Sequence, residues 1–478
     1  MRLYPFVAAG LSLLATWDAR ADTIVLKNGR RIAALSVAVE GDKVRYLTSA
    51  GELALPKSIV DHIEKGGAAQ APDAPSGGAA NLAITPPSIE PTGANAEVES
   101  GAVHDGVVDR NFLAAMASEA RSGAQGANHK AALAYHAAAQ AELSRHDMEH
   151  ALTDERTALT YAPEDPVMLL NVAYLHLRRS ENKQALDYLE RAQRVAPNNP
   201  DVSKLAGWAY YAMNKLNQAV AEWQRSLALR ADPEVQAALD KALRDKQEEE
   251  NYRENESSHF TLRDSGEAEP GLAREVLRAL EAHFAAIESE LSYTPPEPIG
   301  VILYTQQAFA DITSAPGWVG ALNDGRIRVP VQGLTQLTPE LSRVLKHELT
   351  HSFIRQKTRA NAPTWIQEGL AQWMEGKRSS ASTDVLLRVY DAKQAMSLAD
   401  LQGPWMHFSN DVAAYAYAWA LANVEYIVQV DGMTDLDRIL DELGRGSTAE
   451  AAVRNVLHSD YDDLMQSTVH YLRKTYGN

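Results

Sequence analysis

A spacing of 34 residues recurs in the middle of this 478-residue chain and limits how that part can fold. Prolines and alanines return at this spacing, at Pro163 and Pro197, Pro166 and Pro200, Ala151, Ala185 and Ala219, and Ala158 and Ala192. Small residues suit the places where two antiparallel helices cross closely, and prolines suit the boundary between one unit and the next. The spacing therefore predicts a stack of helix pairs, in which each unit buries its apolar face against its neighbours.

This pattern resembles the tetratricopeptide repeat, which has small residues at its eighth and twentieth positions and proline at its thirty-second. Ala173 in the second unit and Gly207 and Tyr210 in the third match it, whereas Glu155 in the first stands where an apolar residue is usual. A plain helical bundle with accidental spacing is the alternative. The resemblance implies a tetratricopeptide-repeat domain over residues 110–250, through which we expect a protein partner to bind.

The first 21 residues have the composition of a secretory signal peptide. Arg2 precedes a mostly apolar run from Tyr4 to Ala15, and Ala19-Arg20-Ala21 has the small-residue pattern of a cleavage site. The apolar run is short for a membrane span, although an uncleaved anchor is the alternative. We therefore expect an exported protein, periplasmic or secreted, with no integral membrane segment after signal cleavage.

Two further segments precede the repeats. Residues 22–64 alternate apolar and polar positions between turn signals such as Asn28-Gly29, which predicts a small β-module of four or five strands. Residues 65–106 are dominated by alanine, glycine, proline and serine, and such a segment buries too little apolar surface to offset its ordering entropy. It is therefore predicted to be a flexible linker.

Charge and cysteine content exclude several kinds of partner and chemistry. The chain has 46 basic and 63 acidic residues, a net charge of −17, which argues against nucleic acid or an anionic membrane surface as its main partner. It has no cysteine, so disulfides, thiolate metal ligands and cysteine nucleophiles are excluded.

Residues 257–478 predict a separate domain of mixed sheet and helices. The charged stretch from Lys241 to Glu256 predicts a helix that caps the repeats and leads into this domain. Strands are expected at Ile299–Tyr304 and Arg326–Val331, and the proline near the end of the second favours a sheet edge. The whole chain is therefore predicted to be an α+β multidomain protein.

Two histidines in this domain have the spacing of a metal site. His347 and His351 are four residues apart on a predicted helix, so both side chains leave one face, and imidazole nitrogen suits zinc. Glu348 is displaced from His347 by about 100° around the helix, so it can face a metal-bound water without being a ligand. A pair of surface histidines is the alternative, because so short a motif also arises by chance.

Glu368 supplies the third ligand that a catalytic zinc needs. It lies 17 residues after His351, on a predicted helix that begins near Pro363, and it shares the apolar side of that helix with Trp365 and Ala371. A buried carboxylate there is costly unless it is paired or binds a metal. Two helices would thus present two histidines and one glutamate to a single zinc ion per chain.

The segment His347-Glu348-Leu349-Thr350-His351, followed by Trp365 to Ala371 in the pattern W-x-x-E-G-x-A, resembles the glutamate-zincin peptidases. It is most similar to the bacterial peptidase MA-like family, and the resemblance extends over about residues 257–430. It implies that His347, His351 and Glu368 bind zinc and that Glu348 is the general base.

The same resemblance implies two further features of the site. Arg326–Val331 corresponds to the edge strand that pairs with an extended substrate. Tyr415, with Tyr417 behind it, corresponds to the group that stabilises the oxyanion, although both could be core aromatics. The G-x-M-E-N segment of glutamate-zincin aminopeptidases is absent, which favours an endopeptidase.

These features predict an exported zinc endopeptidase that cleaves a protein or peptide substrate recruited by its repeats. The alternative is a periplasmic repeat scaffold or adaptor whose peptidase domain is inactive or secondary. The complete set of three ligands and a base argues against a decayed site, because drift would usually remove one of the four.

Overall fold

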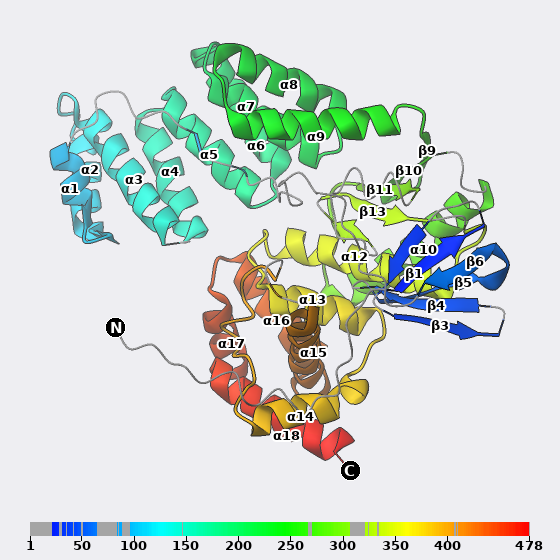
Figure 1. Ribbon diagram of the computed structural model, residues 1–478. Coiled ribbons are helices and arrows are strands. Elements are labelled where there is room, and N and C mark those ends of the chain that lie inside the picture. The colour runs from blue at the N-terminus through cyan, green and yellow to red at the C-terminus, as the bar shows by residue number, and fades with distance from the viewer. Residues whose placement is uncertain are drawn as a thin grey trace, which may run out of the picture.

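The computed structural model (Figure 1) places four structural parts in chain order: a β-module, a helical stack, a five-stranded sheet and a C-terminal group of helices. The described residues are 22–27, 31–34, 36–41, 43–48, 51–64, 84, 86–87, 96–145, 147–265, 270–305, 321–323, 325–331, 334–405, 408 and 410–477. The predicted signal peptide and most of the predicted linker lie outside them. Within this described part of the chain, no helix is long and apolar enough to cross a membrane.

The β-module consists of two three-stranded antiparallel sheets, ordered β2-β1-β6 and β3-β4-β5. Its strands are β1 (Asp22–Leu26), β2 (Arg31–Ala34), β3 (Ser36–Glu40), β4 (Lys43–Thr48), β5 (Gly51–Pro56) and β6 (Val60–Glu64), with the short helix η1 (Lys57–Ile59) before β6. Ile24, Val44 and Leu55 form the centre of its small core. Strand β5 also contacts the long helix α12 (Pro339–Lys357) of the C-terminal part, so the module lies beside that helix.

Part of the predicted linker is ordered, which corrects that prediction. Helix α1 (Ala96–Ala102) and the hairpin of β7 (Val103–His104) with β8 (Val107–Val108) begin before residue 106. Val98 and Ala102 are buried against the helices that follow, so this end of the segment does bury enough apolar surface to be ordered.

The helical stack consists of antiparallel pairs whose second helices begin 34 residues apart, at Met148, Asn182 and Leu216. Its helices are α2 (Arg110–Arg121), α3 (Ala127–Ser144), α4 (Met148–Tyr161), α5 (Pro166–Arg178), α6 (Asn182–Val195), α7 (Pro200–Ala212), α8 (Leu216–Leu229) and α9 (Pro233–Glu249). The helices α3 with α4, α5 with α6 and α7 with α8 pack directly on each other.

The recurring residues mark these helix pairs. Proline is in the first turn of α5, α7 and α9, and the preceding Asp165, Asn199 and Asp232 accept hydrogen bonds from the free amides at those helix starts. Ala151, Ala185 and Ala219 are fully buried where the paired helices cross.

The C-terminal part contains a sheet ordered β12-β13-β11-β10-β9, in which β10, β11 and β13 run parallel and the two end strands run antiparallel. The strands are β9 (Arg253–Glu256), β10 (Phe260–Asp264), β11 (Ile299–Tyr304), β12 (Leu322–Asn323) and β13 (Ile327–Pro330). The helices are α10 (Pro270–Leu291), α12 (Pro339–Lys357), α13 (Thr364–Met374), η2 (Ser379–Ala381), α14 (Thr383–Asp391), α15 (Asn410–Tyr426), the π-helical η3 (Ile427–Asp431), α16 (Met433–Gly444), α17 (Ala449–Leu457) and α18 (Tyr461–Tyr476).

Two predictions at this sheet need correction. The helix predicted over Lys241–Glu256 is present only as far as Glu249, and residues 253–256 instead form β9, which pairs with β10. The predicted edge strand Arg326–Val331 contains β13, which lies inside the sheet, because Gly325, with a positive φ of 108°, turns the chain so that β12 pairs along its outer side. Among the strands that the structure describes, the end strand on this side is therefore β12.

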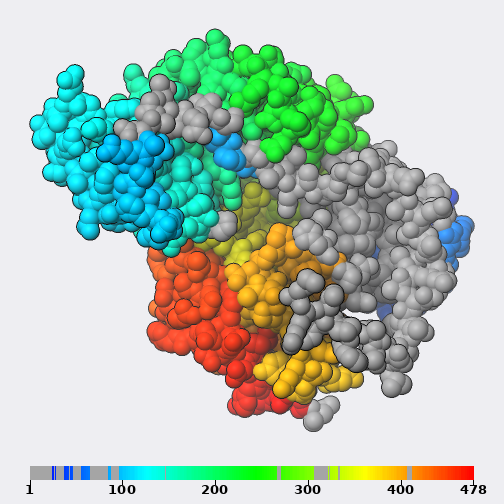
Figure 2. All heavy atoms as spheres, turned by 60° about the vertical axis from the view of Figure 1, so that its left-hand side comes forward, coloured from blue at the N-terminus to red at the C-terminus, as the bar shows by residue number. Residues whose placement is uncertain are grey.

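The helical stack lies across the C-terminal part as an arm that is attached near both of its ends. Figure 2 shows the stack (cyan to green) along one side of the molecule and the last helices (orange to red) below it. Near α4, Glu149 pairs with Arg359 at 2.6 Å, just after α12. At the other end, α9 reaches the sheet through buried charged side chains of β13.

Candidate metal centre

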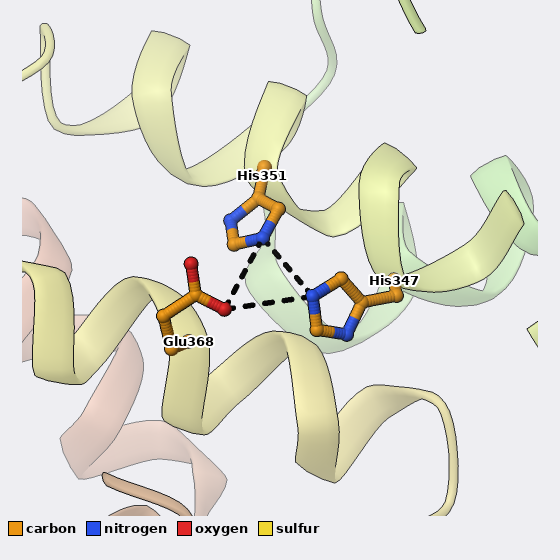
Figure 3. Close-up of side chains that lie close together, drawn as sticks. All are labelled: His347, His351 and Glu368. Carbon is orange, nitrogen blue, oxygen red and sulfur yellow. Dashed lines mark hydrogen bonds and ion pairs between the residues drawn. The ribbon is translucent and has the colours of Figure 1, made fainter. Parts of the chain in front are cut away.

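Helix α12 carries both histidines, and its start follows from local sequence. Thr338 is the N-cap, with its hydroxyl accepting a hydrogen bond from the amide of Leu341, and Pro339 occupies the first turn. His347 and His351, one helical turn apart, both project towards α13 (Figure 3).

The three predicted ligands converge on one point. His347 Nε2 lies 3.2 Å from His351 Nε2, and Glu368 Oε2 lies 3.6 Å from the first and 3.7 Å from the second of these nitrogens. Three ligands each about 2.1 Å from a tetrahedral zinc ion would be about 3.4 Å apart. The donor set and its spacing therefore fit a single zinc ion with a fourth position left for water or substrate.

Glu368 is presented by α13, which approaches α15 very closely. Gly369 makes this approach possible, because a Cβ atom at this position would lie 2.6 Å from Val424 Cγ2 and 2.8 Å from the Ala420 carbonyl carbon. Gln372 joins the same two helices, since its side-chain amide donates to the carbonyl of Tyr417 at 2.9 Å. The glycine after Glu368 thus has a packing role that sequence spacing alone did not reveal.

Glu375 supports His347 and was not predicted. Its Oε1 lies 3.2 Å from His347 Nδ1, on the side of the ring away from Glu368, and Lys377 Nζ lies 2.9 Å from the same oxygen. Metal-ligating histidines commonly donate their second N–H to a carboxylate, which fixes the tautomer and the ring orientation. The only signal in the sequence was an acidic residue two turns after Glu368, at the C-cap of α13.

Glu348 is buried next to the ligands without being one of them. Burial raises the pKa of Glu348 to about 7, and the negative charges of Glu368 and Glu375 add to this effect, while His347 opposes it. A general base is most effective when its pKa lies near the operating pH. The position and the pKa of Glu348 are therefore those expected of a base beside a metal site.

The two histidines differ in charge state. Burial by itself lowers the pKa of His347, but hydrogen bonds to Glu368 and Glu375 outweigh it and raise this pKa to about 10. Burial lowers the pKa of His351 to about 4. A metal ion would take the place of the proton that His347 carries at neutral pH, because metal ligation requires neutral imidazole.

Helix α15 brings a tyrosine to the site. The negative charges of Glu368 and Glu348, together with burial, raise the pKa of Tyr417 well above its usual value, so its hydroxyl lies in the field of both carboxylates. The ring packs edge-on against Trp405, with centroids 5.1 Å apart. Tyr415, two residues earlier, is turned by about 200° around the same helix and so presents its side chain in another direction.

Residues 285–474 match the family model of the Peptidase MA superfamily. The matched segment contains the three candidate ligands, Glu348 and both tyrosines, whereas the helical stack and the β-module lie outside it. The match supports a peptidase-like domain of this superfamily at these residues. No curated protein matches the chain.

Proposed function

We propose that this protein is an exported zinc-dependent endopeptidase of the glutamate-zincin type. The observation that carries the proposal is the convergence of His347, His351 and Glu368 within bonding range of one ion, with buried Glu348 beside them. The match of residues 285–474 to a peptidase superfamily supports it. The signal peptide that the sequence predicts at residues 1–21 is the basis for placing the protein outside the cytoplasm.

In this proposal each residue has a distinct task. His347, His351 and Glu368 hold the ion, and Glu375 keeps the His347 ring in the orientation that points Nε2 at it. Zinc in such a site supplies Lewis-acid chemistry, because it polarises a carbonyl group and lowers the pKa of water to about 7. Glu348 accepts the proton of the attacking water and then returns it to the amine that leaves.

Tyr417 is the better candidate for the oxyanion partner. The family resemblance favoured Tyr415, but Tyr417 is the phenol whose pKa is raised by the charges of Glu368 and Glu348 and by burial. A neutral phenol beside these carboxylates remains a hydrogen-bond donor over the whole physiological range, which is what oxyanion stabilisation requires. Variants of both tyrosines distinguish the two assignments.

The substrate would lie along β12, the end strand beside the metal helix. Asn323 of this strand donates through its side-chain amide to the Glu348 carbonyl at 2.8 Å and to Ser352 Oγ at 2.7 Å, so β12 is attached to α12 at the catalytic turn. An extended peptide that added to the outer side of β12 would run past the metal centre. The helical repeats, which resemble tetratricopeptide repeats, would recruit the protein substrate or an adaptor.

Cleavage by the wild type and by Glu348→Gln tests the function directly. The purified chain should cleave a denatured protein such as casein, lose the activity with phenanthroline and regain it with added zinc. Glu348→Gln should bind one zinc ion and cleave at least about 100-fold more slowly. If the variant cleaved at the wild-type rate, the general-base role would be wrong.

Comparing the envelope proteins of cells that express the wild type or Glu348→Gln would reveal the natural substrate. A protein that accumulates only with the variant is the candidate. The scaffold alternative predicts the same envelope proteins in both strains, together with a loss of function when the repeats are altered.

A further inference from the structure

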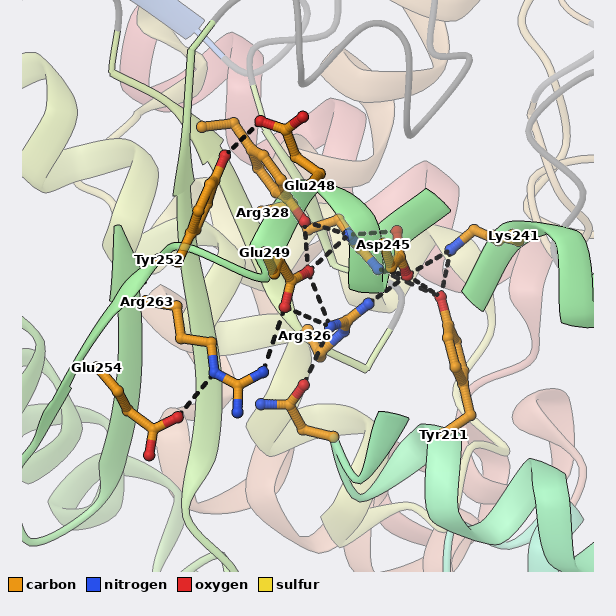
Figure 4. Close-up of polar contacts among 12 residues, drawn as sticks. Tyr211, Lys241, Asp245, Glu248, Glu249, Tyr252, Glu254, Arg263, Arg326 and Arg328 are labelled. Atoms are coloured by element: carbon orange, nitrogen blue, oxygen red, sulfur yellow. Dashed lines mark hydrogen bonds and ion pairs between the residues drawn. The ribbon is translucent and has the colours of Figure 1, made fainter. Parts of the chain in front are cut away.

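A second cluster of charged residues is buried where α9 of the helical arm meets the sheet (Figure 4). Arg326, immediately before β13, and Arg328, within it, are two residues apart and therefore leave the same face of the sheet. Asp245 and Glu249 are one turn apart on α9 and leave the same face of that helix. All four residues are at most 7% exposed, which is rare for charged side chains.

The four residues pair across the junction between arm and sheet. Arg328 makes a two-pronged contact with Asp245, with Nη2 2.8 Å from Oδ2 and Nη1 3.2 Å from Oδ1. Arg326 donates to both carboxylates, reaching Glu249 Oε1 at 3.1 Å. The two buried arginines are therefore paired with the two buried carboxylates, and the partly exposed Lys241 and Arg263 also approach these carboxylates.

Two tyrosines and an asparagine complete the cluster from both sides of the junction. Tyr211 of α7 donates its hydroxyl hydrogen to Asp245 at 2.8 Å, and Tyr304 of β11 donates to Glu249 at 2.8 Å. Asn214, in the loop after α7, accepts from Arg326 at 3.0 Å. That loop approaches β11 at Gly300, where a Cβ atom would lie 3.3 Å from the Asn214 amide nitrogen.

This buried cluster of charges favours one position of the helical arm relative to the sheet. Burying charges is costly, so the pairs add little net stability compared with apolar packing, but any other placement of α9 would leave a buried charge unpaired. The bidentate contact of Arg328 with Asp245 also requires one orientation of the guanidinium group. The cluster therefore determines how α9 lies against β13.

Strand β12 connects β13 to α12, the helix that carries the two histidines. Arg328 is paired in register with Leu322 of β12, and Ile327 with Asn323. Asn323 in turn binds the carbonyl of Glu348 and the hydroxyl of Ser352. A continuous path of contacts thus runs from α9 to the turn of α12 that carries the candidate base.

We infer that α9, the last helix of the repeat arm, contributes to the peptidase site. Asp245 and Glu249 are positioning residues that hold β13 in place, and β13 in turn holds the substrate-binding edge strand β12 against α12. The inference rests on the proposed function for the role of β12. The arm is then an internal support of the site as well as a recruiting surface. A chain shortened to residues 257–478 would remove these carboxylate partners of Arg326 and Arg328.

The test compares Glu249→Gln with Glu250→Gln in the full-length chain. The two substitutions are chemically identical and adjacent on α9, but Glu249 is buried in the cluster and Glu250 is exposed. Glu249→Gln should increase amide hydrogen exchange of residues 322–331 at least tenfold and raise KM for an extended peptide at least fivefold. Zinc stoichiometry should stay at one, and Glu250→Gln should match the wild type throughout.

A purely structural role gives a different result. Loss of stability alone would lower the active fraction, and so kcat per total protein, while KM and the relative exchange of residues 322–331 stayed the same; that outcome would overturn the inference. If Glu249→Gln failed to fold, Tyr211→Phe, which removes one hydroxyl contact to Asp245, should shift both readouts two- to threefold in the same direction. Hydrogen exchange needs neither metal nor cleavage, so it decides the inference even if the wild type cleaved nothing.

Discussion

Replacing Gly369 with alanine tests whether the contact between α13 and α15 holds the metal ligand in place. Ordinary contacts begin at 3.4 Å, whereas the added Cβ atom would lie 2.8 Å from the Ala420 carbonyl carbon and 2.6 Å from Val424 Cγ2. The Ala420 carbonyl oxygen would be closer still, so the two helices would have to separate by more than the roughly 0.6 Å that the carbonyl carbon alone requires. Glu368 is the adjacent residue and would move with its helix.

The expected cost follows from that displacement. Overpacking of this kind destabilises a protein by about 1–3 kcal/mol, which for a domain of this size lowers Tm by roughly 2–12 °C. A metal site tolerates ligand shifts of only about 0.2 Å. We therefore expect zinc affinity to fall about 10- to 100-fold, as it does when the support of a ligand is lost.

The assay is thermal unfolding of the metal-free protein together with zinc titration against a competing chelator. The matched control is Gly403→Ala, because a Cβ atom at Gly403 would meet nothing within 4 Å. Equal Tm and equal zinc affinity of the two variants would show that α13 and α15 do not need their close approach. A lower Tm with unchanged zinc affinity would support the packing and refute its link to Glu368.

Three further predictions concern single groups. His351→Ala should lose stoichiometric zinc by metal analysis, whereas the exposed His470→Ala should retain it. Tyr417→Phe should lower kcat about 100-fold and Tyr415→Phe less than threefold, and the reverse order would restore the assignment from sequence. Although burial by itself raises the pKa of Asp245, Arg328 and Arg326 outweigh it and lower this pKa to about 2. Its folded pKa is thus below the unfolded value of 3.8, so about 2 kcal/mol of stability is present above pH 3.8 and is lost as pH falls towards 2. We therefore expect the difference in Tm between the wild type and Asp245→Asn to become smaller as the pH falls from 3.8 towards 2. A difference in Tm that does not change with pH would contradict this.

The sequence alone predicted the features that are encoded within one or two helical turns. The 34-residue spacing indicated the helix pairs, whose second helices do begin 34 residues apart. The spacing of His347 and His351 put both on one face, and the resemblance added Glu368 as their partner. These inferences succeeded because helical periodicity depends on residues that are close in the chain.

Tertiary structure decided what depends on residues far apart in the chain. The sequence indicated a sheet edge at Arg326–Val331, but the strand order made β12 the edge and buried both arginines beneath the repeat arm. Their partner Glu249 precedes Arg326 by 77 residues, and no local pattern encodes such a pairing. A charged stretch on a helix usually indicates a solvated face, and only the packing of α9 on the sheet shows that two of its carboxylates are buried and paired with arginines.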